Sequence, residues 1–335
     1  MHKALLIGML AVLFTPAVQA SEDPGAAAAG IIPFSFDVEP ITPLPLQVPV
    51  DAAKRALGQA LFFDQRFSAS ANRSCGDCHA LPALIPDQLP VAVLTGERRG
   101  KYPRDMTLLY NVASSFWYNR DGRYAKLERL IEDSISDVDK FNSRWPDVIA
   151  KLARGYQVQA NKAYGTELTQ AVVVDALATF VRSLNAPNAA FDRYLRGDTE
   201  ALSPRQREGY ALFTRIGCSS CHNGRGMGGS FFAQFYIYRH LDAGLNPRLK
   251  DFGRYYVTGE ESDRNSFRVS SLRNVAVTAP YFHDGSAETL VEAITLMANY
   301  QLGLLLTPSE TALLVEFLGS LTGNHPGIQP SGVRQ

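Results

Sequence analysis

Apolar residues at the i, i+3, i+7 spacing of one helical face occur near the end of each half of the chain. They are Leu177, Phe180 and Leu184 in the first half, and Leu314, Phe317 and Leu321 in the second. The second of these helices is predicted to begin at Thr307-Pro308-Ser309-Glu310, a capping box with proline in the first turn, and to end at Gly323. Ser203-Pro204 predicts another helix start. Alternating strand patterns are almost absent, so the pattern predicts a mostly α protein.

The two closing helices belong to a longer internal repeat. Gly58-Gln-Ala-Leu-Phe62 resembles Gly209-Tyr-Ala-Leu-Phe213. Leu109-Tyr-Asn-Val-Ala113 resembles Leu272-Arg-Asn-Val-Ala276, and an Asp-Gly pair follows each at the same distance. The sequence therefore predicts two copies of one helical module in tandem.

The chain is long enough for two domains. The predicted organisation is a signal peptide over 1–20, a flexible, proline-rich strap over 21–50, a first module over 51–200, a second module over 201–327 and a tail over 328–335. The strap is expected to be extended and not a packed element, because proline-rich segments favour that conformation.

The first twenty residues have the three parts of a secretory signal. A positive start is followed by the apolar run Ala4 to Phe14 and by the small residues Val18 and Ala20. This run is too short to cross a membrane, and no later stretch is long enough. Lys+Arg and Asp+Glu are balanced at 33 each, which gives no argument for a nucleic-acid partner. We expect a soluble periplasmic protein.

All four cysteines of the chain lie in two Cys-x-x-Cys-His motifs. These are Cys75-Gly-Asp-Cys78-His79 and Cys218-Ser-Ser-Cys221-His222. The spacing lets two thiols form thioethers with one haem while the following histidine binds its iron. Two disulfides would leave both histidines unexplained, and a zinc site would need its ligands close together. We therefore predict two covalently bound haems c, one in each of two tandem cytochrome c-like domains.

The sixth ligand of each iron decides the chemistry, because methionine closes a haem for electron transfer whereas an open position admits a small oxidant. Met297 lies in a helix predicted over about Ala287 to Leu302, and its counterpart in the first half of the repeat is Ser134. We predict ligation of the second haem by His222 and Met297, and an open first haem at His79. The alternatives for Met297 are a core position or a rival ligand, Met227.

These residues resemble the bacterial dihaem cytochrome c peroxidase and MauG family over about residues 55–325. The segments that carry the resemblance are Leu57–Asp64, Cys221-His222-Asn223-Gly224, Phe267–Asn274, Thr278–Gly285 and Met297 with Gln301-Leu-Gly303. The resemblance implies that the N-terminal haem reacts with peroxide and that the C-terminal haem is a high-potential relay. Because family peroxidases are often dimers, it also leaves a homodimer open.

The resemblance further implies one calcium ion between the haems, with ligands that match Asp105, Thr278 and Pro280. The family usually has asparagine at the first of these positions, and oxygen ligands suit a hard cation. His283 matches a residue beside the second haem, where a hydrogen bond to a propionate is a reasonable role.

The sequence departs from the family at the catalytic positions. The histidine that caps the oxidised first haem in the peroxidases matches Glu97 here, which suggests a haem that is always open. The distal glutamate matches Lys140, so Glu97, Asp139 and the nearby Asp137 are the candidates for proton transfer. The tryptophan between the haems is replaced by Arg120. Trp117 is then either a shifted charge relay or a core residue.

Three functions remain open. The main hypothesis is a periplasmic peroxidase that reduces hydrogen peroxide at the first haem, with electrons relayed through the second haem from a small cytochrome c or a cupredoxin. The second is a MauG-like enzyme that oxidises tryptophan or tyrosine side chains of a partner protein. The third is a non-catalytic dihaem electron carrier, in which both irons would be six-coordinate.

Overall fold

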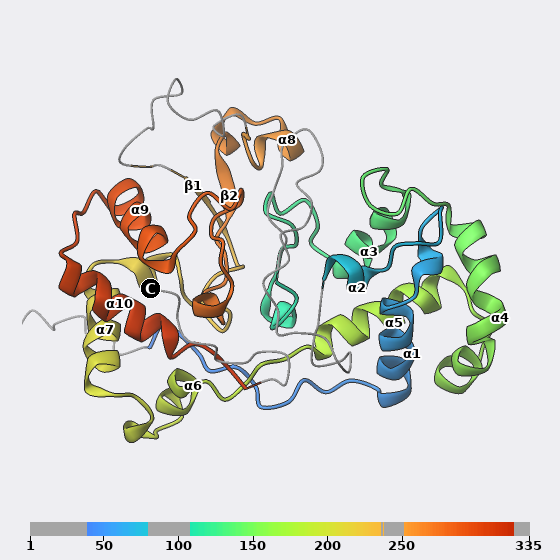
Figure 1. Cartoon of the computed structure of the whole chain (residues 1–335), viewed down its shortest axis with the longest axis horizontal. Helices are drawn as coiled ribbons and strands as arrows, with labels where there is room; N and C mark the ends of the chain where they lie inside the picture. The colour runs from blue at the N-terminus through green and yellow to red at the C-terminus, as the bar shows by residue number, and fades with distance from the viewer. Residues whose placement is uncertain (1–38, 80–107, 236, 238–250, 325–335) are drawn as a thin grey trace, which may run out of the picture. The chain divides into compact units, whose positions relative to one another are not determined.

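The computed structural model describes residues 39–79, 108–235, 237 and 251–324. The helices of the first half are α1 (Ala52–Phe62), α2 (Cys75–Cys78), α3 (Leu127–Ser136), α4 (Trp145–Tyr164) and α5 (Gln170–Ser183). Those that follow are α6 (Ala190–Leu195), α7 (Pro204–Arg215), α8 (Tyr255–Thr258), α9 (Leu290–Leu302) and α10 (Pro308–Gly319) (Figure 1). Short strands β1 (Phe232–Gln234) and β2 (Ser266–Arg268) pair antiparallel. The predicted mostly α fold is confirmed.

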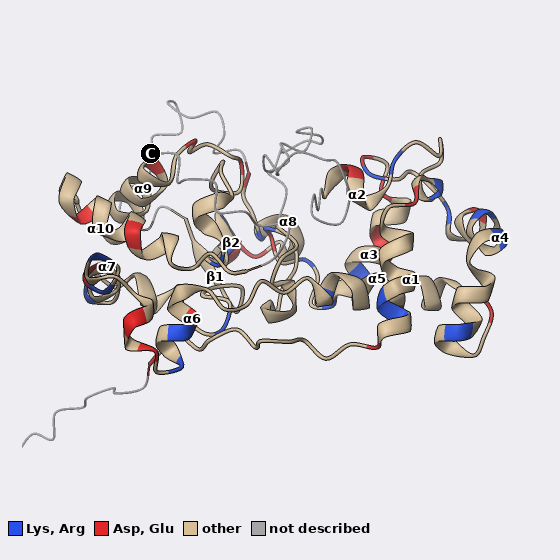
Figure 2. Cartoon of the chain, turned by 60° about the horizontal axis from the view of Figure 1, so that its bottom comes forward, with Lys and Arg blue, Asp and Glu red and all other residues tan. Residues whose placement is uncertain are grey.

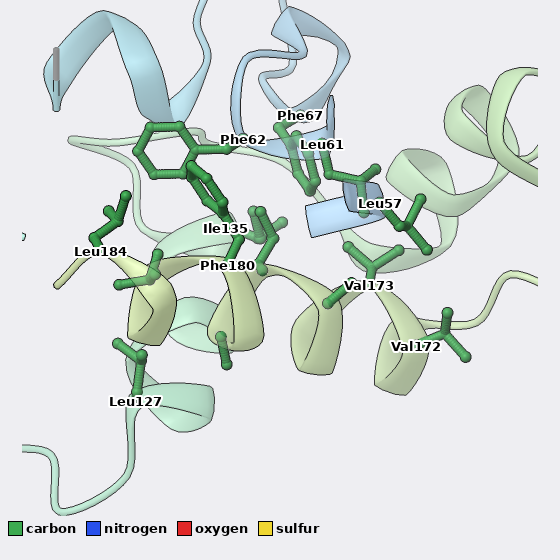
Figure 3. Packing of buried hydrophobic residues seen from close by; sticks show 14 of the residues in the cluster. Leu57, Leu61, Phe62, Phe67, Leu127, Ile135, Val172, Val173, Phe180 and Leu184 are labelled. Atoms are coloured by element: carbon green, nitrogen blue, oxygen red, sulfur yellow. The ribbon is translucent and has the colours of Figure 1, made fainter. Parts of the chain in front are cut away.

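The core of the first half forms where α1 packs across α5 (Figure 3). Phe62 of α1 lies 5.1 Å from Phe180 of α5 between ring centroids, and both side chains are almost fully buried. Gly58 lies at the crossing, where an added Cβ would stand 1.9 Å from the carbonyl oxygen of Ala176. The absence of a side chain at Gly58 therefore allows the two backbones to approach.

The second half repeats this arrangement with α7 and α10. An added Cβ at Gly209 would stand 2.1 Å from the carbonyl oxygen of Leu313, and Phe213 packs on Phe317. Both helices begin where the sequence predicts, with capping boxes at Ser203 and Thr307 and proline in the first turn.

The predicted helix end at Gly323 is wrong. Helix α10 ends at Gly319, and Ser320 is its C-cap. Gly323 instead passes close to Ala186 of the first half, because an added Cβ would stand 1.9 Å from the carbonyl oxygen of Ala186. The N–H of Gly323 donates to Oδ1 of Asn274. Close backbone approach, not helix termination, explains this glycine.

The predicted register of the repeat is confirmed by matching backbone details. Asn111 and Asn274 both adopt the left-handed conformation, with φ of 64° and 63°, at the start of a short 3-10 helix. Each side-chain Oδ1 accepts a backbone N–H at the equivalent place, from Ala186 and from Gly323. Isolated antiparallel bridges recur in the same register, joining Tyr118 with Tyr124 and Tyr281 with Ala287.

The part of the strap that the structure describes, residues 39–50, forms no helix or strand, but the expectation that it is not packed is wrong for this part. Ile41 and Leu44 are 1% and 2% exposed, and Ile41 belongs to the second hydrophobic core. The strap also holds the chain after the second haem motif, since the N–H of Gly224 donates to the carbonyl oxygen of Pro40. Apolar residues between the prolines therefore make the strap part of the core.

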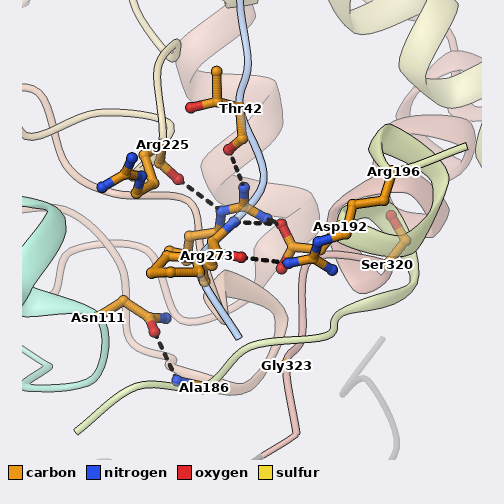
Figure 4. Close-up of polar contacts among 12 residues, drawn as sticks. Thr42, Asn111, Ala186, Asp192, Arg196, Arg225, Arg273, Ser320 and Gly323 are labelled. Atoms are coloured by element: carbon orange, nitrogen blue, oxygen red, sulfur yellow. Dashed lines mark hydrogen bonds and ion pairs between the residues drawn. The ribbon is translucent and has the colours of Figure 1, made fainter. Parts of the chain in front are cut away.

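A buried ion pair anchors the same strap (Figure 4). Arg273 and Asp192 lie 2.7 Å apart, and both side chains are 0% exposed. Arg273 also donates to the carbonyl oxygens of Thr42 and Arg225, while Asp192 accepts the N–H of Leu44. The pair thus joins the strap, α6 and the loop after the second haem motif.

Helix α6 packs with the second core although it precedes residue 201. Phe191 makes edge contacts with Phe317 and Tyr210. The domain boundary between residues 200 and 201 stays a prediction.

Residues of both signs occur on the helices of each half, for example on α4 and α6 (Figure 2), as the balanced composition implies. None of the helices that the structure describes is both long and apolar enough to cross a membrane. The predicted signal peptide lies outside the described residues.

Candidate functional site

The first haem motif is held on one helical turn. Ser74 caps α2, since its side chain accepts the N–H of Asp77, and the carboxylate of Asp77 accepts the N–H of Ser74 in return. The N–H of His79 donates to the carbonyl oxygen of Cys75 at 2.8 Å. This turn keeps the two cysteines and the histidine at the spacing that one haem requires.

The second haem motif reaches a similar turn by a different route. A 3-10 helix (Cys218–Ser220) follows Gly217, which is left-handed with φ of 98°, and the N–H of His222 donates to the carbonyl oxygen of Cys218 at 2.9 Å. Nδ1 of His222 lies 3.3 Å from the carbonyl oxygen of Met227. A hydrogen bond from Nδ1 orients the ring and leaves Nε2 available to a metal.

Both histidines are in the protonation state that binds iron. Burial, and next the positive charge of Lys140, lower the pKa of His79 to about 4. Burial also lowers the pKa of His222, although hydrogen bonds with the carbonyl groups of Met227 and Ser270 oppose the shift. Neutral imidazole, the form present at pH 7, is the metal ligand.

The cysteines are free thiols in both motifs. Burial raises the pKa of Cys75 to about 12 and that of Cys218 to about 11. The disulfide alternative therefore has no support from the geometry. The described part of the chain also contains no group of three or more His, Cys, Asp or Glu that could hold a metal.

The donors of each half fit a c-type haem. Besides two free thiols and a neutral histidine, the described residues of each half include one buried side-chain amide donor without an acceptor, Nδ2 of Asn111 and Nδ2 of Asn274. These atoms occupy equivalent positions of the repeat. Because buried donors are normally paired, an orphan at the same place in both halves fits a cofactor with acceptor groups bound once in each half.

The two halves differ at the position predicted for the sixth ligand. Met297 is half-buried in α9, whereas its counterpart in α3 is Ser134, whose hydroxyl donates to the carbonyl oxygen of Leu130 at 2.7 Å. Leu127 and Leu290, each 3% exposed, are the first residues of these helices. The helix expected from about Ala287 thus begins at Leu290, because Thr289 accepts the N–H of Glu292 and caps it.

Met227, the rival ligand, is fully buried in the second core. Its backbone is left-handed, with φ of 49°, and its carbonyl oxygen is the one that lies beside His222.

The two candidates for proton transfer that the structure describes, Asp137 and Asp139, have different surroundings. Glu97 lies outside the described residues. Asp139 is exposed, and its N–H donates to Oδ1 of Asp137. Asp137 forms an ion pair with Lys140 at 2.9 Å, and Nζ of Lys140 is 3.4 Å from Oγ of Ser134. Asp137 and Lys140 lie at the two ends of a turn after α3, in which the N–H of Lys140 donates to the carbonyl oxygen of Asp137, and the sequence reasoning missed this pair.

Trp117 lies where the two halves meet. Its ring is 5.5 Å from that of Phe232 in β1, and the guanidinium of Arg254 lies 5.4 Å from the Trp117 ring centroid. Arg120, at the position of the family tryptophan, donates to Oγ of Ser270 at 3.0 Å. Neither Arg254 nor its neighbour Arg268 was singled out from the sequence, because isolated arginines give no pattern.

The remaining predicted residues have these surroundings. His283 stacks on Phe267 with a centroid distance of 4.1 Å. Thr278 donates from its hydroxyl to the carbonyl oxygen of Val275, and Pro280 follows a cis peptide bond. Asp105 lies outside the described residues, so the calcium site stays a prediction.

The matching family profile and two similar proteins are all described as cytochrome c peroxidases. The sequence profile of a family described as di-haem cytochrome c peroxidase matches residues 52–200. The chain is 37% identical to cytochrome c peroxidase Ccp of Escherichia coli over 85% of its own length, but spans only 61% of that relative. It is 35% identical to cytochrome c551 peroxidase of Pseudomonas aeruginosa, over 97% of this chain and 94% of the relative.

A solved structure shares the fold. A MauG-like protein associated with microbial copper homeostasis superposes with a TM-score of 0.70 at 23% identity, over 89% of this chain and 98% of that chain. At this identity the likeness concerns the fold alone.

Proposed function

Because this chain belongs to the dihaem cytochrome c peroxidase and MauG family, a family of oxidoreductases with two haems c, we propose that it reduces hydrogen peroxide to water at the haem of the first motif. Two electrons would come from a small redox protein, a cytochrome c or a cupredoxin, by way of the haem of the second motif. The two electrons and two protons convert one peroxide into two waters. When bound, each haem supplies an iron that exchanges one electron, and an iron without a side-chain sixth ligand also admits a small oxidant.

The difference between Ser134 and Met297 is the observation that carries this proposal. The Ser134 hydroxyl is directed to the carbonyl oxygen of Leu130, and a hydroxyl is in any case a poor ligand for haem iron. Met297, in the same register of the second half, has a thioether on a half-buried helix position. This asymmetry supports one open and one closed haem.

Met297 is a better candidate ligand than Met227. The Met227 side chain packs in the second core, and its backbone carbonyl lies beside His222, on the side of the proximal ligand. Met227 therefore orients His222, and Met297 would be the second side chain that holds the iron of this haem. This division of roles is what a His/Met haem needs.

Proton delivery is assigned to Asp137. Its carboxylate pairs with Lys140, which in turn reaches the hydroxyl of Ser134 and influences the pKa of His79. Asp139 is exposed and touches Asp137 only through its backbone N–H. A carboxylate held in this way could take a proton from one peroxide oxygen and return it to the other.

The predicted signal sequence supports a periplasmic location for this reaction. Calcium at Asp105, Thr278 and Pro280 remains part of the proposal.

The decisive experiment combines spectroscopy with turnover. Electron paramagnetic resonance of the resting oxidised protein should show one high-spin and one low-spin iron, and the reduced donor should be oxidised in proportion to added peroxide. Met297→Leu should change only one haem spectrum. Met227→Leu is the matched control and should leave the ligation unchanged.

Two outcomes would overturn the proposal. Two low-spin irons and no reaction with peroxide would mean an electron carrier. Peroxide consumption with no oxidation of the donor, but with oxidised tryptophan or tyrosine in a second protein, would mean the MauG-like activity.

A further inference from the structure

Arg268, the last residue of β2, is a buried charge without an acidic partner. Its side chain is 6% exposed, and its Nε donates to the backbone oxygen of Asn119 at 3.1 Å. Among the residues that the structure describes, no carboxylate forms an ion pair with it. A buried charge normally has a counterion, because the loss of hydration costs several kcal/mol.

Other arginines close to it in sequence do have acidic partners. Arg254 pairs with Asp263 at 3.3 Å, and Arg264 pairs with Glu261. Both are more exposed than Arg268, so the residue with the greatest need for an anion is the one that lacks it.

A second guanidinium increases this need. The backbone N–H of Arg268 donates to the carbonyl oxygen of Arg120 at 2.9 Å. Burial, and next the charge of Arg120, lower the pKa of Arg268 to about 10, so the side chain is still cationic at pH 7. The nearby charge of Arg120 adds to the cost of burying Arg268, because like charges that lie close together repel each other.

The arginine pair lies next to the second haem motif. Arg120 donates to the hydroxyl of Ser270, and the backbone of Ser270 hydrogen-bonds with the ring of His222. One residue thus separates the guanidinium from the predicted iron ligand. The groups on a haem that could neutralise the charge of Arg268 are its propionate carboxylates.

We propose that Arg268, with Arg120 beside it, binds a propionate of the second haem and raises the reduction potential of that haem. Reduction removes one positive charge from the iron, so nearby cations favour the reduced state. The pair would thereby make the second haem a stronger acceptor for electrons from the donor protein. Both arginines are positioning residues here, because they act through the cofactor's carboxylate and not on peroxide.

The test is a potentiometric titration of the haem-loaded protein, in which the absorbance of each haem is followed separately. In Arg268→Gln the reduction equilibrium of the second haem should fall by on the order of tenfold, about 59 mV for one electron, and that of the first haem should stay unchanged. Arg268→Lys, which keeps the charge, should lose less. Arg264→Gln is the matched control, since Arg264 already has Glu261, and should cause no shift.

Arg120→Gln provides an independent variant if Arg268→Gln does not fold, and a smaller fall in the same haem is expected. Unchanged potentials in a folded, haem-loaded Arg268→Gln or Arg120→Gln protein would overturn the proposal, as would a shift confined to the first haem. The titration needs no peroxide. A lack of turnover would therefore contradict the proposed function and leave this inference standing.

Discussion

The two halves of the molecule share a backbone arrangement but differ in their side chains, and three of the differences bear on the proposed function and on stability. Tyr110 of the first half corresponds to the buried Arg273, Ser134 to Met297, and Glu128 to the exposed Val291. The shared backbone arrangement includes residues whose backbone is left-handed at equivalent positions, such as Asn111 and Asn274. The side chains at other positions differ, so the two halves can take the separate roles that the proposed function gives them.

Exchange of the sixth-ligand residue tests this comparison most severely. Ser134→Met would give the first half the thioether of the second, and we expect peroxide turnover to fall to background, because the open iron position becomes filled. Electron paramagnetic resonance should show the high-spin signal converted to low-spin. Ser136→Met, at an exposed position two residues on in the same helix, is the control and should retain activity. Retained turnover in Ser134→Met would show that the repeat register does not identify the open side.

Much of this comparison could be predicted from the sequence. The Cys-x-x-Cys-His turns, the capping boxes at Ser203 and Thr307 and the repeat register all depend on residues close in sequence. The alignment of Ser134 with Met297 needed only the constant spacing of the repeat. Local patterns are reliable because the same few residues determine both the pattern and the structure.

The parts that sequence reasoning missed depend on residues far apart. Nothing around Arg273 indicates that Asp192 pairs with it, and Ile41 is packed only because a second core forms beside it. Gly323 was misassigned for the same reason, since its close contact is with Ala186. Charges such as that of Arg268 become informative only when their burial and their partners are known.

The next difference to test is Arg273, the counterpart of Tyr110, which forms the strap anchor, that is, the buried ion pair of Arg273 with Asp192. Arg273→Met leaves Asp192 as an uncompensated buried charge and leaves the carbonyl oxygen of Thr42 without its donor. We expect the free energy of unfolding to fall by about 3–5 kcal/mol, measured by urea denaturation. The double variant Asp192→Leu with Arg273→Met should recover part of the loss, because neither charge is then buried.

Arg225→Ala is the control for the strap anchor. Arg225 has an exposed side chain and contributes only its backbone oxygen to Arg273, so little change is expected. A loss in Arg273→Met no greater than that in Arg225→Ala would mean that the strap is held by Ile41 and Leu44 alone.

The smallest expected effect on stability concerns Glu128 of α3, which forms an ion pair with Arg182 of α5. Its counterpart in the second half, Val291, is uncharged. The hydrogen bond from Arg182 lowers the pKa of Glu128. The pair is therefore fully stabilising above the unfolded pKa of about 4.3, and this contribution is lost as the pH falls through the lower folded pKa. Both side chains are about one-third exposed, so Glu128→Gln should cost only about 0.2–1 kcal/mol at pH 7. In urea denaturation the difference from the unaltered protein should disappear at low pH.

Glu132→Gln, whose partner Arg129 is on the same helix, should have a smaller effect. An equal Glu128→Gln difference at pH 7 and at low pH would show that packing of the side chain, not its charge, joins the two helices.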